Sequence, residues 1–282
     1  MRRYGTASGT LNYETSFASY VQSGQVQVHR EDISHLSPQT IHLSSGTELS
    51  VDALVACTGY SAKPTINFVP ASTHSNLGIP TSELNKTQLG FWQDLCTRAD
   101  LTIGARFPSL LRGPSKGPGS STPVPYNPGA AGEAKYTPWR LYRGIAPPGL
   151  AAAGDRSLVF LGMFSNIANT IRLEIQCLWA LAYLEGRLPA ADADMENERI
   201  FDETALFQRF TELRAPYGHG RLHPDLSFDQ LPYFELLLSD LGLKTQRKAN
   251  WFRELFEPYS QRDYAAIVEE WISSLEPMPS HK

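Results

Sequence analysis

Cysteine is scarce in this chain. Its 282 residues include three cysteines, Cys57, Cys96 and Cys177, and none of them belongs to a Cys-x-x-Cys pair. This spacing argues against a disulfide framework and against a metal site built from thiolates. Cys57 and Cys177 fall in predicted buried elements, where they would act as small apolar side chains of a protein from a reducing compartment, which favours the cytoplasm.

Long apolar runs and an excess of positive charge are missing too. No stretch approaches the roughly 18 to 20 apolar residues that span a bilayer, and no apolar run follows Arg2 and Arg3 as in a signal peptide. The net charge is −4 and the basic residues are scattered, whereas surfaces that bind nucleic acid cluster Lys and Arg. With 41% hydrophobic and 19% charged residues, the sequence predicts a soluble globular protein of about two domains, with no membrane span and no nucleic-acid partner.

The sequence Gly-x-Gly-x-x-Gly, which places a pyrophosphate at a helix N-terminus, is also absent. The segment 112–138 is dense in Gly, Pro and Ser and contains Gly-Pro-Ser-Lys-Gly-Pro-Gly at 113–119. That stretch lacks the Gly-Lys-(Ser/Thr) order of a phosphate loop, and its prolines remove N–H donors, so we do not expect it to hold phosphate. We interpret 112–138 as a long mobile loop.

A β-meander is predicted near the N-terminus. Residues 25–30 and 40–43 alternate apolar and polar side chains, and Ser45-Gly46 separates the second run from 47–51 in the manner of a hairpin turn. Three short strands joined in this way would pair with their sequence neighbours.

A buried strand is expected directly after the meander. Residues 53–57 are apolar, as in a strand covered on both faces. The run ends in Thr58, Gly59 and Tyr60, where the glycine lets the backbone turn sharply and pass close to a ligand. We therefore treat these three residues as a candidate ligand-binding turn.

A second unit of this kind follows later. Residues 157–163 are typical of a fully buried strand, and 171–184 of a helix with almost no polar face, hence a largely buried one. Gly186 is placed to end that helix in a left-handed conformation. The polar turn between strand and helix offers four N-cap candidates: Ser165, Asn166, Asn169 and Thr170.

These elements resemble the flavin-containing monooxygenases. In that family a strand ends in an ATGY or CTGY motif, and a later strand ends in Gly-Met or Gly-Leu before a helix carrying (E/D)xQxxW and a closing glycine. The matching residues here are Gly162, Met163, Glu174, Gln176, Trp179 and Gly186. The stretches 139–143, 147–148 and 154–156 resemble the fungal branch of the family, and the resemblance covers most of residues 20 to 270.

The resemblance implies an α/β fold: an incomplete two-dinucleotide-binding, Rossmann-like flavoprotein with a β-meander and a helical C-terminal region. Its parts would be the end of an NADPH-type domain at 1–65, a connecting segment with the mobile loop at 66–150, the last strand and helix of the FAD domain at 151–190, and a helical region at 191–282. Because both glycine-rich fingerprints are absent, the chain looks like the C-terminal part of such an enzyme. The pattern predicts further helices near 87–99, 196–214, 232–243, 249–256 and 264–275.

The resemblance also implies FAD and NADPH as cofactors, and oxygenation of a small nucleophilic or carbonyl substrate. Ligands of open α/β sheets lie beyond the carboxyl ends of the strands, which favours the turn from Met163 to Thr170. The resemblance assigns cofactor contacts to Asn166 and Asn169 there and to Thr58, Gly59 and Tyr60 in the first turn. No side chain is a convincing catalytic acid or base, so the catalytic residues stay unassigned.

Other constellations have simpler readings. His219 and His223, with Asp225, are spaced like metal ligands on a helix, but Gly220 and Pro224 argue for a surface turn, so we expect no metal site.

Two further features have a structural and a functional reading. Arg172 and Glu174 are expected to form a structural ion pair rather than a functional one. Residues 251–256 are expected to form an amphipathic helix that faces the core, although its apolar face could instead meet a partner.

Other classes of function stay open at this point. The chain could be a noncatalytic docking module derived from such an enzyme, held to a partner chain that covers the surface left by the missing N-terminal half. It could also be part of an N-hydroxylase or of a Baeyer–Villiger-type monooxygenase. In the enzyme reading, the chain alone is expected to be inactive, because FAD affinity depends largely on the glycine-rich turn that this sequence lacks.

Overall fold

A computed structural model describes residues 17–55, 66, 68–70, 73–82, 86–111, 136–164, 168–188, 197–214 and 221–275. Backbone contacts divide the chain into two compact units, residues 9–61 and a larger unit formed by residues 1–8 and 62–282. Each unit is described by itself.

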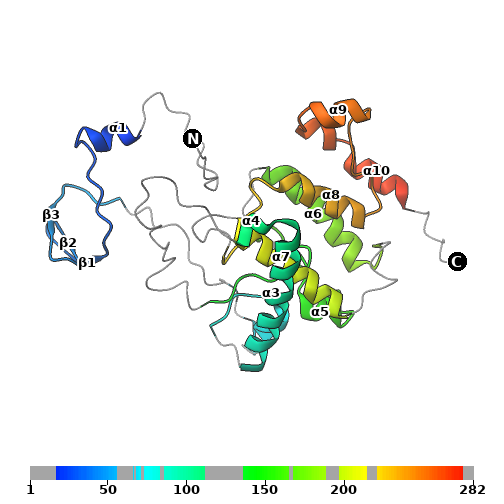
Figure 1. The fold of residues 1–282 in the computed structure, drawn as a ribbon, viewed down its shortest axis with the longest axis horizontal. Helices are drawn as coiled ribbons and strands as arrows, with labels where there is room; N and C mark the ends of the chain where they lie inside the picture. The colour runs from blue at the N-terminus through cyan, green and yellow to red at the C-terminus, as the bar shows by residue number, and fades with distance from the viewer. Residues whose placement is uncertain are drawn as a thin grey trace. The chain divides into compact units, whose positions relative to one another are not determined.

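The smaller unit contains the predicted meander. Helix α1 (Phe17–Gln22) precedes an antiparallel sheet of order β1-β2-β3, formed by β1 (Ile33–Ser37), β2 (Thr40–Leu43) and β3 (Glu48–Ser50) (Figure 1).

The first strand of that sheet lies later than the alternation predicted, because residues 25–30 are irregular and exposed. The register explains the shift: Ser37 pairs with Thr40 across a two-residue link in which Gln39 has φ +58°, so the segment next to β2 in sequence takes the place beside it. The turn predicted at Ser45-Gly46 is present, with Gly46 at φ +88°.

The expected buried strand at 53–57 is not supported by its described part. Residues 53–55 are irregular, and Val55 is 81% exposed. Apolar strands of this kind become buried when parallel neighbours and helices cover both faces. In the described part of the chain the sheet ends at β3 and provides no such cover. Cys57, Thr58, Gly59 and Tyr60 lie outside the described residues.

The larger unit is helical in its described part. It contains α2 (His74–Leu77), α3 (Lys86–Arg106), α4 (Pro108–Leu111), α5 (Pro148–Ala152), α6 (Asn169–Leu184), α7 (Asn197–Arg214), α8 (Gln230–Asp240), α9 (Trp251–Phe256), the 3-10 turn η4 (Gln261–Tyr264) and α10 (Ile267–Ser274). Helix α3 runs along α7, and α6 packs against α8 (Figure 1). All five further helices that the pattern predicts are found, with α3 extending well beyond its predicted end. The structure is thus a mixture of helices and a small antiparallel sheet, and the described residues contain no parallel sheet.

The main core forms around α6. Ile175, Trp179 and Ala182 are fully buried, and the Trp179 ring stacks on Tyr183 with centroids 5.1 Å apart. At Gly186 the helix ends as predicted: φ is +68°, and the next N–H donates to the carbonyl of Ala182.

One face of α6 is more exposed than the sequence predicted. The helix is largely buried, as predicted, with nine of its 16 residues buried, but four apolar side chains on one side of it are exposed: Leu173, Cys177, Leu181 and Leu184. Their spacing of four, four and three residues places them on a single stripe. Cys177 is therefore an exposed thiol and not a core residue, because the described elements cover the opposite face of the helix.

The segment 157–163 is not a strand. Leu158, Val159 and Phe160 are half-buried, and Leu161 is exposed. A backbone hydrogen bond from the N–H of Phe160 to the carbonyl of Ile145, at 2.9 Å, joins it to the loop before α5. The apolar run predicted a strand, but strand structure also needs a neighbouring strand to pair with, and the described residues supply none here.

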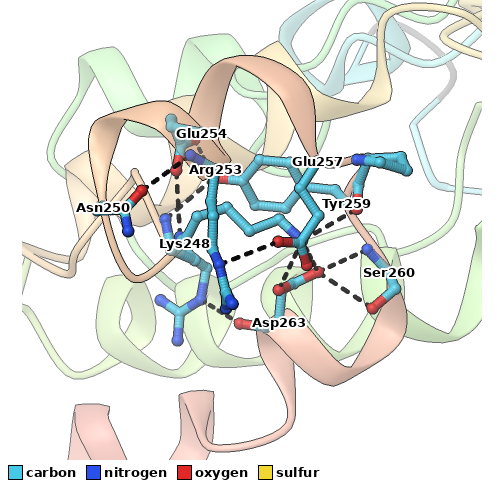
Figure 2. Close-up of polar contacts among 10 residues, drawn as sticks. Lys248, Asn250, Arg253, Glu254, Glu257, Tyr259, Ser260 and Asp263 are labelled. Atoms are coloured by element: carbon cyan, nitrogen blue, oxygen red, sulfur yellow. Dashed lines mark hydrogen bonds and ion pairs between the residues drawn. The ribbon is translucent and has the colours of Figure 1, made fainter.

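The expectation that 251–256 faces the core is wrong as well. The apolar side chains of α9 are exposed, Trp251 by 73%. The helix is held from its polar side: the Asn250 side chain caps it by accepting from the N–H of Arg253 (Figure 2). Beneath the helix, the buried Nζ of Lys248 donates to Asp263 at 2.9 Å and to Glu257 at 3.3 Å.

The predicted mobile loop falls mainly at 112–135, which lies outside the described residues. Its last part, 136–138, is described and partly buried. The N–H of Thr137 donates to the carbonyl of Thr81, and the N–H of Thr81 donates back to the Thr137 hydroxyl, both at 3.0 Å. Residues 136–138 have no regular secondary structure, as expected of a loop, and these two bonds anchor them to the segment before α3.

Candidate functional site

The turn before α6 is tied to the helix by buried polar contacts. The N–H of Gly162, which has φ +76°, donates to the side-chain carbonyl of Gln176 at 3.1 Å. The Gln176 amide nitrogen in turn donates to the hydroxyl of Tyr233 on α8 at 2.8 Å, and that hydroxyl donates to the backbone carbonyl of Arg143 at 2.9 Å. Gln176 is the glutamine of the (E/D)xQxxW pattern. It thus connects the turn, α6 and α8. Burial raises the pKa of Tyr233, so its hydroxyl stays protonated and can donate.

Arg172 lies beneath the same turn. Its side chain is buried, and its Nη1 donates to the backbone carbonyl of Phe164 at 2.5 Å while the guanidinium lies over the Phe164 ring. Its Nε is buried without a hydrogen-bond partner, and among the described residues no carboxylate pairs with Arg172. Burial lowers the pKa of this guanidinium, which is the expected response of a charge without a counter-ion. The expected ion pair with Glu174 is wrong: Glu174 is exposed on the far side of α6.

The start of α6 has no side-chain cap. Ala168 occupies the N-cap position, and Asn169 and Thr170 are the first, exposed residues of the helix, so neither of them caps it as the sequence suggested. The N–H of Ala168 donates to the side chain of Gln230 at 3.3 Å. A 16-residue helix that opens at an exposed end directs its positive dipole, worth about 0.3 to 2 kcal/mol, toward an anion placed there. Ser165 and Asn166 lie outside the described residues.

Arg143 is the structural centre of an ion-pair cluster that the sequence reasoning did not single out. It bonds Asp240 through two nitrogens, at 2.7 and 3.3 Å, and pairs with Glu203 at 2.7 Å. Asp240 also accepts from the indole nitrogen of Trp179 at 2.9 Å. Burial lowers the pKa of Arg143, but Asp240, Tyr142 and Glu203 together outweigh it and raise the pKa. Trp179 of the (E/D)xQxxW pattern is thus tied to the same ion-pair cluster, a role that spacing along the sequence cannot show.

The described site residues have different surroundings. Met163 is half-buried and packs against a small core cluster that contains Trp139 and Leu141, whereas Asn169 and Thr170 are exposed at the helix start. Asn166 lies outside the described residues, as do Thr58, Gly59 and Tyr60.

The metal reading of the histidine segment gains no support. Asp225 accepts from the N–H of Ser227 at 2.9 Å, as in a local turn, and His223 is exposed. His219 lies outside the described residues, and within those that are described no cluster of His, Cys, Asp or Glu is arranged to hold a metal ion. The helices in the described ranges are also too short or too polar to cross a membrane.

An anionic cofactor edge fits the turn before α6. The fit depends on two observations, the buried Arg172 guanidinium with an unpartnered Nε and the uncapped start of a long helix. Each of them favours negative charge in its neighbourhood. The groups that grip a pyrophosphate are not part of this arrangement, since the sequence has no Gly-x-Gly-x-x-Gly.

Comparison with known proteins supports the flavin cofactor that the sequence resemblance implied. The chain is 33% identical over 258 residues to the FAD-dependent monooxygenase resA of Aspergillus sclerotiorum, an alignment that covers 90% of this chain and 41% of that protein. It is 31% identical over 271 residues to the FAD-dependent monooxygenase DEP4 of Fusarium langsethiae, with 94% and 43% covered. It is 29% identical over 269 residues to DEP4 of Alternaria brassicicola.

The chain therefore matches a C-terminal part of fungal FAD-dependent monooxygenases. It spans about two-fifths of the length of these relatives. No protein-family model and no solved structure matches the chain significantly.

Proposed function

We propose that the chain is the C-terminal part of a flavin-dependent monooxygenase that uses FAD, NADPH and O2 to oxygenate a small nucleophilic or carbonyl substrate. The similarity to FAD-dependent monooxygenases over 90% of the chain supports the cofactor. Bound FAD would supply the redox chemistry, with NADPH as reductant. In this proposal the chain's own residues position and polarise one edge of the cofactor.

In this proposal, residues around the turn before α6 position the flavin edge and stabilise its charge. Arg172 and the α6 dipole would stabilise negative charge at the flavin edge, with Asn166, Asn169 and Thr170 as contacts. Gln176 and Tyr233 would hold the turn in place through the hydrogen bonds to Gly162 and Arg143. Thr58, Gly59 and Tyr60 would line the crossing toward NADPH.

The observation that carries the proposal is the exposed apolar stripe on α6. Leucines at 173, 181 and 184 and the thiol of Cys177 face solvent on a helix whose other side forms the core. These leucines are 38 to 43% exposed, so burying the rest of each would contribute about 1 kcal/mol, and together these contributions make such a face costly to leave exposed. About three-fifths of each relative's sequence lies outside the part that this chain covers. We infer that the stripe packs against a nucleotide-binding part of that kind, and that the chain alone is inactive.

The test is a chimera that joins the uncovered part of the Aspergillus sclerotiorum relative to this chain. The chimera should retain flavin, with absorbance near about 450 nm, and should consume O2 in the presence of NADPH, while the chain alone should be colourless and inactive. Leu181→Glu should abolish flavin retention in the chimera. The matched control is Leu101→Glu, which changes an exposed leucine of α3 and should leave flavin bound.

The reactivity of Cys177 measures whether the apolar stripe of α6 is covered in the chimera. Its thiol should react readily with a soluble thiol reagent in the chain alone and should be protected in the chimera, with Cys177→Ser as the blank. A chimera that folds, leaves Cys177 reactive and binds no flavin would contradict the proposal. A chain that is yellow by itself would show that the cofactor is held by other residues.

A further inference from the structure

A cavity of about 360 Å³ is lined by residues of α3, α7 and α8 together with Arg143. Its volume is at the lower end of the range for small-molecule sites. Six of its ten lining side chains are apolar: Ile103, Phe107, Leu206, Phe207, Phe210 and Leu236. The sequence analysis singled out none of these residues.

One wall of the cavity contacts the main core through Phe207, whereas Phe107 at another wall is 51% exposed. The Phe207 ring packs against Tyr233, with centroids 6.0 Å apart, and against Phe164 at 6.4 Å. Phe107 and Phe210 lie 6.0 Å apart at another wall. Side chains held in this way do not simply collapse into an empty space, since packed interiors deform little. The cavity therefore offers a preformed space between aromatic rings.

Most of the polar lining groups already have partners. Arg143 and Glu203 pair with each other at 2.7 Å, and Arg143 is also bound to Asp240. The Thr102 hydroxyl donates to the backbone carbonyl of Arg98 at 3.1 Å. These groups contribute little unsatisfied hydrogen-bonding capacity to a ligand.

Arg106 differs from the other polar lining groups in having no partner among the described residues. It is the last residue of α3, it is exposed, and it lines the cavity. Within the ranges that the structure describes, it has no ion-pair or hydrogen-bond partner. A guanidinium presents a planar fork of N–H donors that matches a carboxylate in a bidentate way. A free cation beside an aromatic-lined space selects a ligand with an apolar body and one negative charge.

We propose that this cavity is a binding site for an amphipathic carboxylate, whose apolar body lies between Phe107, Phe207 and Phe210 and whose carboxylate pairs with Arg106. The proposal does not rest on the proposed function: the cavity shares the contacts of Phe207 with Phe164 and Tyr233, but a ligand there requires no bound FAD. It can therefore be tested on the chain itself, and its failure would leave the proposed function untouched.

The experiment measures binding of two probes of equal shape, 2-naphthoate and 2-naphthamide, by isothermal titration calorimetry. The wild-type chain should bind the carboxylate with a Kd below about 1 mM, as expected for a ligand of this size. It should prefer the carboxylate over the amide by about tenfold, the size of one charge-assisted contact. Arg106→Gln should remove this preference while leaving amide binding unchanged.

Two further variants separate the cavity from the rest of the surface. Leu206→Trp should fill the space and abolish binding of both probes, with circular dichroism and the melting temperature confirming that the variant is folded. Arg98→Gln changes an exposed arginine of the same helix that pairs with Asp202 at 3.0 Å, and it should leave the preference intact. Absence of saturable binding, equal affinity of the wild type for both probes, or an equal effect of Arg98→Gln and Arg106→Gln would each overturn the proposal.

Discussion

The side chain of Gln176 accepts a hydrogen bond from the backbone N–H of Gly162 at 3.1 Å, across 14 residues of sequence. The contact joins the first turns of α6 to the end of the preceding apolar segment. Its other end, the Gln176 amide, donates to Tyr233. A single buried amide thus satisfies groups on two different elements, and its loss leaves the Gly162 N–H without a partner, while the Tyr233 hydroxyl keeps its bond to the carbonyl of Arg143.

Replacing Gln176 with leucine tests this link. Gln176→Leu keeps the volume but leaves the Gly162 N–H unsatisfied, so the free energy of unfolding should fall by about 1 to 3 kcal/mol. Urea denaturation followed by circular dichroism measures the change. Glu174→Leu alters an exposed position of the same helix and should stay within about 0.5 kcal/mol of the wild type. Equal effects of the two substitutions would show that the buried link contributes nothing.

The ion-pair cluster at Arg143 should be sensitive to a change of one atom. Asp240→Asn removes the charge that neutralises Arg143, while Glu203 remains as a second partner. We expect a loss of about 2 kcal/mol in the free energy of unfolding, less than the 3 to 5 kcal/mol of a fully broken buried pair.

Asp202→Asn is the matched control for this cluster. Asp202 pairs with Arg98 at the surface, where the two side chains are 41% and 54% exposed, and its loss should cost less than about 1 kcal/mol. Both values come from the same urea titration. A larger loss at Asp202 than at Asp240 would contradict the assignment of Arg143 as the structural centre.

Two glycines with the same backbone conformation should respond differently to alanine. Gly78 and Gly154 have φ of +68° and +73°, so each substitution should cost about 1 to 2 kcal/mol for the left-handed conformation. A Cβ at Gly78 would lie 1.9 Å from the backbone carbonyl oxygen of Arg140, whereas nothing lies within 4 Å at Gly154. Gly78→Ala should therefore cost more than about 3 kcal/mol, or prevent folding. Similar melting temperatures of the two variants would rule out this close approach.

The Lys248–Asp263 contact beneath α9 should make stability depend on pH. Burial would raise the pKa of Asp263, but the hydrogen bonds and charge of Lys248 and the bonds from Ser260 outweigh it, so the pKa lies below the ordinary value of 3.8 (Figure 2). A carboxyl group with a lowered pKa in the folded state stabilises the protein above its unfolded pKa, and this contribution disappears as the pH falls through the folded pKa.

The wild type should therefore be more stable than Asp263→Asn near neutral pH, and the difference should shrink as the pH falls below 3.8. Melting temperatures across the acid range measure it. Asp94→Asn, at an exposed position of α3, is the control and should show a difference that does not follow this course. A difference between wild type and Asp263→Asn that stays constant down to acid pH would contradict the ion pair.

The amino-acid sequence alone predicted several local features, such as a helix and its end, and the resemblance to a protein family. The helical period of 171–184, the glycine at 186 and the alternation at 40–43 depend on neighbours along the chain, and the structure confirms α6, its left-handed end and the meander. The similarity to FAD-dependent monooxygenases confirms the family resemblance read from Gln176, Trp179 and Gly186.

Only the tertiary structure decided what each side chain faces. Apolar runs at 53–57 and 157–163 predicted buried strands, but a strand needs a partner, and pairing depends on residues distant in sequence. The exposure of Leu181 and Cys177, the unpaired guanidinium of Arg172 and the cavity beside Arg106 arise where separate elements meet or fail to meet. Periodicity shows that a helix has an apolar face, and the arrangement of the other elements determines whether that face becomes core or stays available to another part of the protein.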